Sequence, residues 1–94
     1  MYSVVGVWDL EPDQADRQRQ MLETQIVPSV RQAAGLIKGY WAGTPGQRSY
    51  SFIVFEDQTA AEQFAANVRG NQQGQADSGV GALELSIVPI SAQT

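Results

Sequence analysis

Two aromatic stretches separated by a short turn constrain the fold of this chain more than any other feature. They occupy residues 36–42 and 48–56, and the glycine- and proline-containing residues 43–47 lie between them. Gly35 reaches left-handed backbone angles easily and predicts the end of a preceding helix. The sequence Thr-Ala-Ala-Glu from residue 59 has the spacing of a capping box, which predicts the start of another helix. The segment therefore predicts a helix end, a β-hairpin and a second helix.

The N-terminal part predicts a strand followed by a long, interrupted helix. Residues Tyr2–Leu10 are rich in β-branched and aromatic side chains and are too few for a helix. Both alternating faces of this strand are apolar, which predicts that both faces are covered. Pro12 and neighbouring acids predict a helix that runs to about Ala34. Pro28 lacks an amide donor, so we expect a kink or break near Val27.

The C-terminal part completes a βαββαβ order. Apolar residues recur at helical spacing over residues 61–68, whereas the glycine- and glutamine-rich residues 70–81 predict a flexible loop. Residues 82–89 alternate as a strand does, and the chain after Ile90 is expected to fray. The sequence therefore predicts one α+β, ferredoxin-like domain over residues 1–94, with a four-stranded antiparallel sheet and two helices on one face.

Composition excludes several classes of chemistry. The chain has no histidine and no cysteine, which excludes Ser-His-Asp and Cys-His nucleophiles, thiolate zinc sites and histidine-ligated haem. Six basic and ten acidic residues give a net charge of −4, which disfavours general binding to phosphate backbones. Acidic residues near Pro12 suit a helix N-terminus, so no metal is expected. Neither a membrane span nor a secretory signal is visible, and a cytoplasmic location is the expectation.

Three segments resemble the antibiotic-biosynthesis monooxygenase-like family: residues 26–31, residues 35–41, and residues 50–57 with the alanine-rich helix that follows. The resemblance implies a homodimeric α/β barrel, in which two sheets pack face to face and each subunit keeps a small pocket between sheet and helices. It also implies a small apolar or aromatic ligand and chemistry without a cofactor, if the chain is an enzyme. Haem-degrading relatives use an Asn, a Trp and a His. This chain lacks histidine, and its asparagines, Asn67 and Asn71, lie on or after the second helix. Haem degradation of that kind is therefore not expected.

A rival interpretation comes from residues Arg48–Phe55, which resemble the octamer of the RNA-recognition motif. In that family aromatic side chains on the third strand stack on bases, and here Tyr50 and Phe52 would do so. The first strand fits less well, because Gly6 stands where a stacking aromatic residue belongs. The acidic charge and the long first helix also favour the small-molecule interpretation over RNA binding.

The candidate ligand-binding residues are five aromatic residues of the expected sheet and one acid of the last strand: Trp8, Tyr40, Trp41, Tyr50, Phe52 and Glu84. Aromatic walls with a few polar groups are typical of a pocket for a flat ligand. The same aromatic residues would equally serve a core or a dimer interface, and no catalytic residue is assigned.

Three positions, Glu84, Arg48 and Gly6, each allow a role in ligand binding or catalysis and a purely structural role. Glu84 is either a general base in a half-buried pocket or a solvated edge residue. Arg48 either holds an anionic or phenolate substrate or lies exposed at the hairpin end. Gly6 leaves a gap beside Trp8 that a ligand or a neighbouring side chain fills. A purely structural assembly role predicts, in contrast, that side chains fill the space between sheet and helices.

Overall fold

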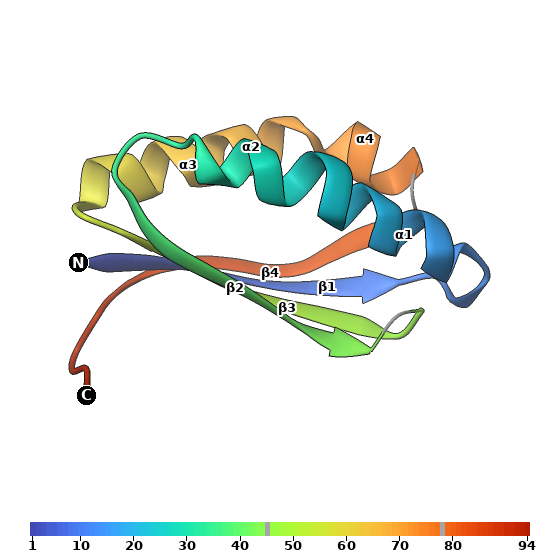
Figure 1. Ribbon diagram of the computed structural model, residues 1–94, viewed down its shortest axis with the longest axis horizontal. Helices are drawn as coiled ribbons and strands as arrows, with labels where there is room; N and C mark the ends of the chain where they lie inside the picture. The colour runs from blue at the N-terminus through green and yellow to red at the C-terminus, as the bar shows by residue number, and fades with distance from the viewer. Residues whose placement is uncertain (45, 78) are drawn as a thin grey trace.

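The computed structural model describes residues 1–44, 46–77 and 79–94. Its elements, in chain order, are β1 (Tyr2–Leu10), the 3₁₀ turn η1 (Pro12–Gln14), α1 (Ala15–Met21), the π-helical turn η2 (Leu22–Ile26), α2 (Val27–Arg31), β2 (Leu36–Thr44), β3 (Arg48–Phe55), α3 (Gln58–Gly70), α4 (Gln72–Asp77) and β4 (Val80–Pro89). Helices occupy one side of the sheet (Figure 1). The α+β class and the ferredoxin-like order are confirmed.

The four strands form one antiparallel sheet in the order β2-β3-β1-β4. The first strand is therefore central, with hydrogen-bonded neighbours on both sides. Its register aligns Val4 with Ile53 of β3 and with Ile87 of β4. Residues directly opposite each other point to the same face of a sheet. We call the face that carries Val4 and Ile53 the inner face, because helices cover it, and the opposite face the outer face.

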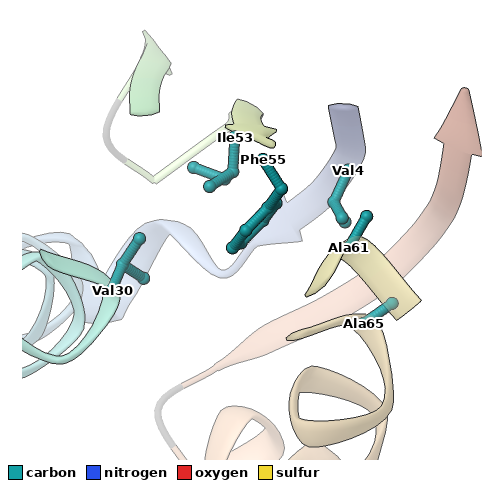
Figure 2. Packing of buried hydrophobic residues seen from close by; sticks show 6 residues of the cluster. All are labelled: Val4, Val30, Ile53, Phe55, Ala61 and Ala65. Atoms are coloured by element: carbon teal, nitrogen blue, oxygen red, sulfur yellow. The ribbon is translucent and has the colours of Figure 1, made fainter. Parts of the chain in front are cut away.

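The apolar core lies between the inner face and the helices. Its buried members come from β1, β3, α2 and α3: Val4, Val30, Ile53, Phe55, Ala61 and Ala65 (Figure 2). Phe55 is fully buried and its ring lies 5.1 Å from that of Phe64, between ring centres. The small alanines of α3 let this helix approach the sheet closely. The core is therefore concentrated at the end of the sheet where β3 runs into α3.

The first helical region is interrupted where the sequence predicts a break. Five residues, Leu22–Ile26, form a π-helical turn, and α2 then begins at Val27 with Pro28 in its first turn. The π turn runs directly into α2, and the amide of Val27 donates to the carbonyl oxygen of Leu22. The change in hydrogen-bond pattern therefore falls where Pro28 lacks an amide to donate. The helix ends at Arg31, earlier than the expected Ala34. Gly35 has the expected positive φ of 76°, but it leads into β2 instead of capping the helix directly.

The capping box predicted for α3 is wrong. The helix begins at Gln58, and the carboxylate of Asp57 accepts a hydrogen bond of 2.8 Å from the amide of Ala60. Asp57 therefore occupies the N-cap, and Thr59 lies inside the first turn. An Asp at the N-cap satisfies an amide that the helix itself leaves free. The two candidates lie two residues apart, and the sequence pattern alone favoured the wrong one.

The predicted flexible loop at residues 70–81 is also wrong over most of its length. It contains α4, and β4 begins at Val80, two residues before the expected start. The side chain of Gln75 donates to the carbonyl oxygen of Val68 at 3.1 Å, which ties α4 back to α3. Ser78, and Pro45 of the predicted hairpin turn, lie outside the described residues. No helix in the described ranges has both the length and the apolar character that crossing a membrane requires.

Candidate ligand cavity between sheet and helices

A cavity of about 530 Å³ lies between the inner face and the helices. Residues of β1, β2, β3 and β4 line it from the sheet, and residues of α1, η2, α2, α3 and α4 line it from the helical side. Ligand pockets for small organic molecules occupy roughly 300–1,000 Å³. The assembly interpretation predicted a filled space here, whereas the structure has a cavity of ligand size.

Two tryptophans belong to the sheet side of this cavity. Trp8 of β1 and Trp41 of β2 both line it, and both follow a glycine by two residues. A Cβ atom built on Gly6 would lie 2.8 Å from Nε1 of Trp8, and one built on Gly39 would lie 3.4 Å from Cη2 of Trp41. Each indole therefore folds back along its strand over a glycine. The indole N–H of Trp8 also donates to Oγ of Ser51 at 3.3 Å.

Polar groups on the helical side are mostly neutral amides. The side chain of Gln18 is buried, and its amide donates to the carbonyl oxygens of Glu11 at 3.1 Å and Gly79 at 3.2 Å. These bonds tie α1 to the segment before it and to the turn before β4. The other amide side chains that line the cavity come from η2, α3 and the α4 region: Gln25, Asn67, Asn71 and Gln75.

Charged groups are scarce around the cavity. Among the described residues that line it, the ionisable ones are Arg19 and Arg48. Arg19 donates to Asp16 at 3.0 Å in an ion pair exposed to solvent, which contributes little to stability. Arg48 is the first residue of β3 and shares the alternation of the outer face with Tyr50. No carboxylate, phenol or amine among the described residues lines the cavity, so its lining offers no side-chain general base of those types.

The structure does not bring the six predicted ligand-binding residues together. Trp8 and Trp41 line the cavity. The other three aromatic residues lie on the outer face, where their exposed fractions are 56% for Tyr40, 49% for Tyr50 and 42% for Phe52. The register pairs Tyr40 with Phe52 across β2 and β3. These three side chains form an aromatic surface on the side of the sheet that no helix covers.

Glu84, the sixth predicted residue, lies on the edge strand β4. The register places it opposite Val7 on the outer alternation, next to a shift in pairing between β1 and β4. It lines a smaller depression of about 230 Å³, together with Trp8, Arg69 and Leu83. Glu84 is exposed and has no ion pair among the described residues. Its position is that of a solvated edge residue at the rim of this depression.

Two positions that shape the floor of the cavity were missed from the sequence, and the use of a third, Gly6, was left open. Ser51 and Gly39 were not singled out, and the expected gap beside Gly6 is occupied by the indole of Trp8. The repeated pattern Gly-x-Trp, at residues 6–8 and again at 39–41, was the available signal. Because residues two apart on a strand share a face, a glycine at that spacing leaves room for the large side chain beside it.

Comparisons with known proteins identify the fold. No protein-family model matches the sequence, and no curated protein is significantly similar to it. Among solved structures, a putative antibiotic biosynthesis monooxygenase from Deinococcus radiodurans has a TM-score of 0.80 and 17% identity, and the match covers 100% of this chain and 96% of that one. HapK from Hahella chejuensis has a TM-score of 0.71 and 13% identity, with coverage of 100% and 97%.

A third solved structure carries a ligand. The monooxygenase ActVA-Orf6 of Streptomyces coelicolor, in complex with nanaomycin D, has a TM-score of 0.64 and 16% identity, and the match covers 99% of this chain and 90% of that one. These likenesses extend over nearly the whole chain and support the resemblance noted in the sequence. At these identities they show a shared fold, and the fold leaves the ligand and the reaction to the residues of each cavity.

Proposed function

We propose that this protein binds a small, flat, mainly apolar molecule in the cavity between its sheet and helices. The observation that carries the proposal is the cavity of about 530 Å³ with Trp8 and Trp41 on its floor. Indole rings offer a large apolar surface that stacks on flat ligands. The neutral amides Asn67 and Gln25 supply hydrogen bonds without demanding a charged ligand.

Binding and catalysis are separate claims. The solved structures with this fold include a monooxygenase that holds nanaomycin D, which supports an aromatic ligand here as well. Cofactor-independent oxygenation is the reaction that we would test first. Since the lining offers no carboxylate, phenol or amine among the described residues, the substrate itself would have to be electron-rich and easily ionised.

Fluorescence titration tests binding directly. The chain contains two tryptophans, and both line the cavity, so its tryptophan emission reports on that space. We expect 1,4-naphthoquinone to quench this emission saturably. Trp41→Leu should weaken binding roughly tenfold, the order of one lost aromatic contact. Tyr40→Leu, a matched change on the outer face, should leave the dissociation constant within twofold. Quenching that never saturates, measured in the wild-type protein, would refute the proposal.

Oxygen uptake answers the catalytic question in the same preparation. Anthrone has a reactive methylene group, and a monooxygenation consumes one O₂, leaves one oxygen atom in the new carbonyl group and releases the other as water. We expect uptake above the spontaneous rate only with protein present, and Trp41→Leu should reduce it. Binding without uptake would leave the protein as a binder.

We further propose that the outer face packs against a second copy of the chain. Three aromatic side chains and Val88 are exposed there. The helices of the described residues lie on the opposite side of the sheet (Figure 1). An exposed apolar surface of this kind is typical of an interface. The central strand β1 also carries Val5 and Val7 on this side, which are half-buried in the single chain. Sheet-to-sheet packing would remove these residues from water.

RNA stacking on Tyr50 and Phe52 is the competing use of this surface. The described charged residues of the outer alternation include Asp9, Glu84, Lys38 and Arg48. Two acids offset two bases, so this face does not carry the excess of basic residues on which binding to a phosphate backbone depends. Sedimentation at micromolar concentration distinguishes the two uses of this surface. We expect a dimer and no shift with single-stranded RNA at low salt. A monomer that binds RNA would favour the competing interpretation.

A further inference from the structure

Ser51 occupies the middle of the cavity floor. It lies on β3, is buried, and lines the cavity. The register places Gly6 opposite it on β1 and Trp41 opposite it on β2. Strands β1 and β2 are the two neighbours of β3, so they lie about 10 Å apart. Ser51 is thus a small polar side chain in a trough that tryptophans border on both sides.

The chemistry of the two groups fixes the direction of the hydrogen bond between Trp8 and Ser51. An indole N–H can only donate, whereas a serine hydroxyl has one donor and two acceptor positions. In the 3.3 Å bond, Trp8 is therefore the donor and Oγ of Ser51 the acceptor. The hydroxyl of Ser51 keeps its own hydrogen, which it donates to none of the described residues. That hydrogen is available to an acceptor in the cavity.

Gly6 keeps this arrangement in place. A Cβ atom there would lie 2.6 Å from Oγ of Ser51, 2.8 Å from Nε1 of Trp8 and 2.9 Å from its Cε2. These distances are shorter than real Cβ contacts, so any side chain at this position displaces the indole or the hydroxyl. The contact on the other side of the trough is looser, because a Cβ on Gly39 meets the flexible end of Ile53 at 2.9 Å and Trp41 at 3.4 Å.

We infer that the Ser51 hydroxyl, oriented by Trp8 over Gly6, donates the hydrogen bond that anchors an oxygen atom of the ligand. The inference rests on the proposed function, because it concerns the ligand of the same cavity. It narrows that ligand to flat molecules with a carbonyl or phenolate oxygen next to an apolar ring system. Trp8 acts in two ways, as an apolar wall and as the group that orients the serine.

A pair of probes with the same ring system isolates the anchor. 1,4-Naphthoquinone carries two carbonyl oxygens, naphthalene carries none, and the chain has no cysteine that would add to the quinone. Calorimetric titration should show that Ser51→Ala weakens 1,4-naphthoquinone binding about five- to tenfold, the size of one hydrogen bond. Naphthalene binding should change less than twofold. Equal losses for both probes, or no loss for either, would overturn the inference.

Two glycine variants provide a matched control. Gly6→Ala should lower the preference for the quinone over naphthalene as Ser51→Ala does, because it displaces Trp8 or Ser51. Gly39→Ala should preserve that preference even if it weakens both probes, because it does not touch the serine. Loss of the preference in Gly39→Ala would contradict the assignment. The indole N–H resonance of Trp8, assigned by nuclear magnetic resonance, should shift in Ser51→Ala, which checks the bond in each folded variant.

The results separate this inference from the proposed function. If neither probe binds the wild-type protein, the proposed function fails. If both bind and the quinone preference survives in Ser51→Ala, only the anchor is refuted.

Discussion

The two faces of the sheet are made by the same strands and differ in almost everything else. On β3, Phe55 of the inner face is 0% exposed, whereas Phe52 of the outer face is 42% exposed. The inner face carries the core and the cavity, and Val4, Val30 and Ile53 belong to both. The helices lie over this face (Figure 1). The outer face carries an uncovered aromatic surface. Aromatic residues in a strand therefore do not by themselves indicate burial within the chain, because the face on which they lie decides it.

The sharpest test of this difference replaces one phenylalanine on each face by alanine, in separate variants. Phe55→Ala should lower the free energy of unfolding by about 3–5 kcal/mol, because it opens a cavity in a fully packed core. Phe52→Ala should cost far less at protein concentrations where the chain is a monomer. Urea unfolding measures both, and Phe55→Leu supplies a milder change if the alanine variant does not fold. If both variants lost the same free energy of unfolding in dilute protein, the outer face would be packed within a single chain.

A charge on the outer face tests what covers it. Phe52→Lys places an ammonium group in the centre of the aromatic surface, and burying it against a second sheet is unfavourable. We expect the dimer dissociation constant to rise at least a hundredfold, or about 2.7 kcal/mol by the conversion for binding constants. Sedimentation velocity over a range of concentrations measures this. The affinity for 1,4-naphthoquinone should stay within twofold, since Phe52 does not line the cavity. A dimer of unchanged strength would place the interface elsewhere.

The smallest expected effect concerns the helix that covers the inner face. Asp57→Ala removes the carboxylate that caps α3 and should lower the free energy of unfolding by about 1 kcal/mol. Thr59→Ala, the change that the sequence pattern would have chosen, should cost less than about 0.5 kcal/mol. Thermal unfolding of the two variants in one buffer makes the comparison. The reverse order would restore the capping box and move the start of the helix.

The fold could be predicted from the sequence because the signals were local. Period-two patterns located the strands, and Pro28 marked the break in the first helix. Of the two predictions that failed, the capping box was a local choice between Asp57 and Thr59, whereas the loop at residues 70–81 depended on contacts between elements. The glycines and glutamines of residues 70–81 are typical of a loop, yet α4 forms there with Gln75 bonded to Val68 of α3. Sequence periodicity records which residues share a face but not which neighbour a helix end will find.

The candidate site was less predictable for a related reason. Alternation separated Trp8 from Val5 and Val7, but alternation alone did not show which face of β2 and β3 would meet the helices. Tyr40, Tyr50 and Phe52 therefore stood beside the tryptophans as equal candidates, although they point to the other side. The second Gly-x-Trp would have pointed to the correct face, because a glycine two residues away leaves room for an indole that folds back along the strand.

The π-helical turn at Leu22–Ile26 makes the roof of the cavity sensitive to chain length. Leu22, Gln25 and Ile26 all line the cavity, and a π turn holds one residue more than an α turn. Removing a single residue here would convert the π turn into a regular α turn, which keeps the faces of α1 and α2 but changes which side chains of the turn line the cavity. The shape of this cavity can therefore be altered by insertion or deletion, with the sheet beneath it left unchanged.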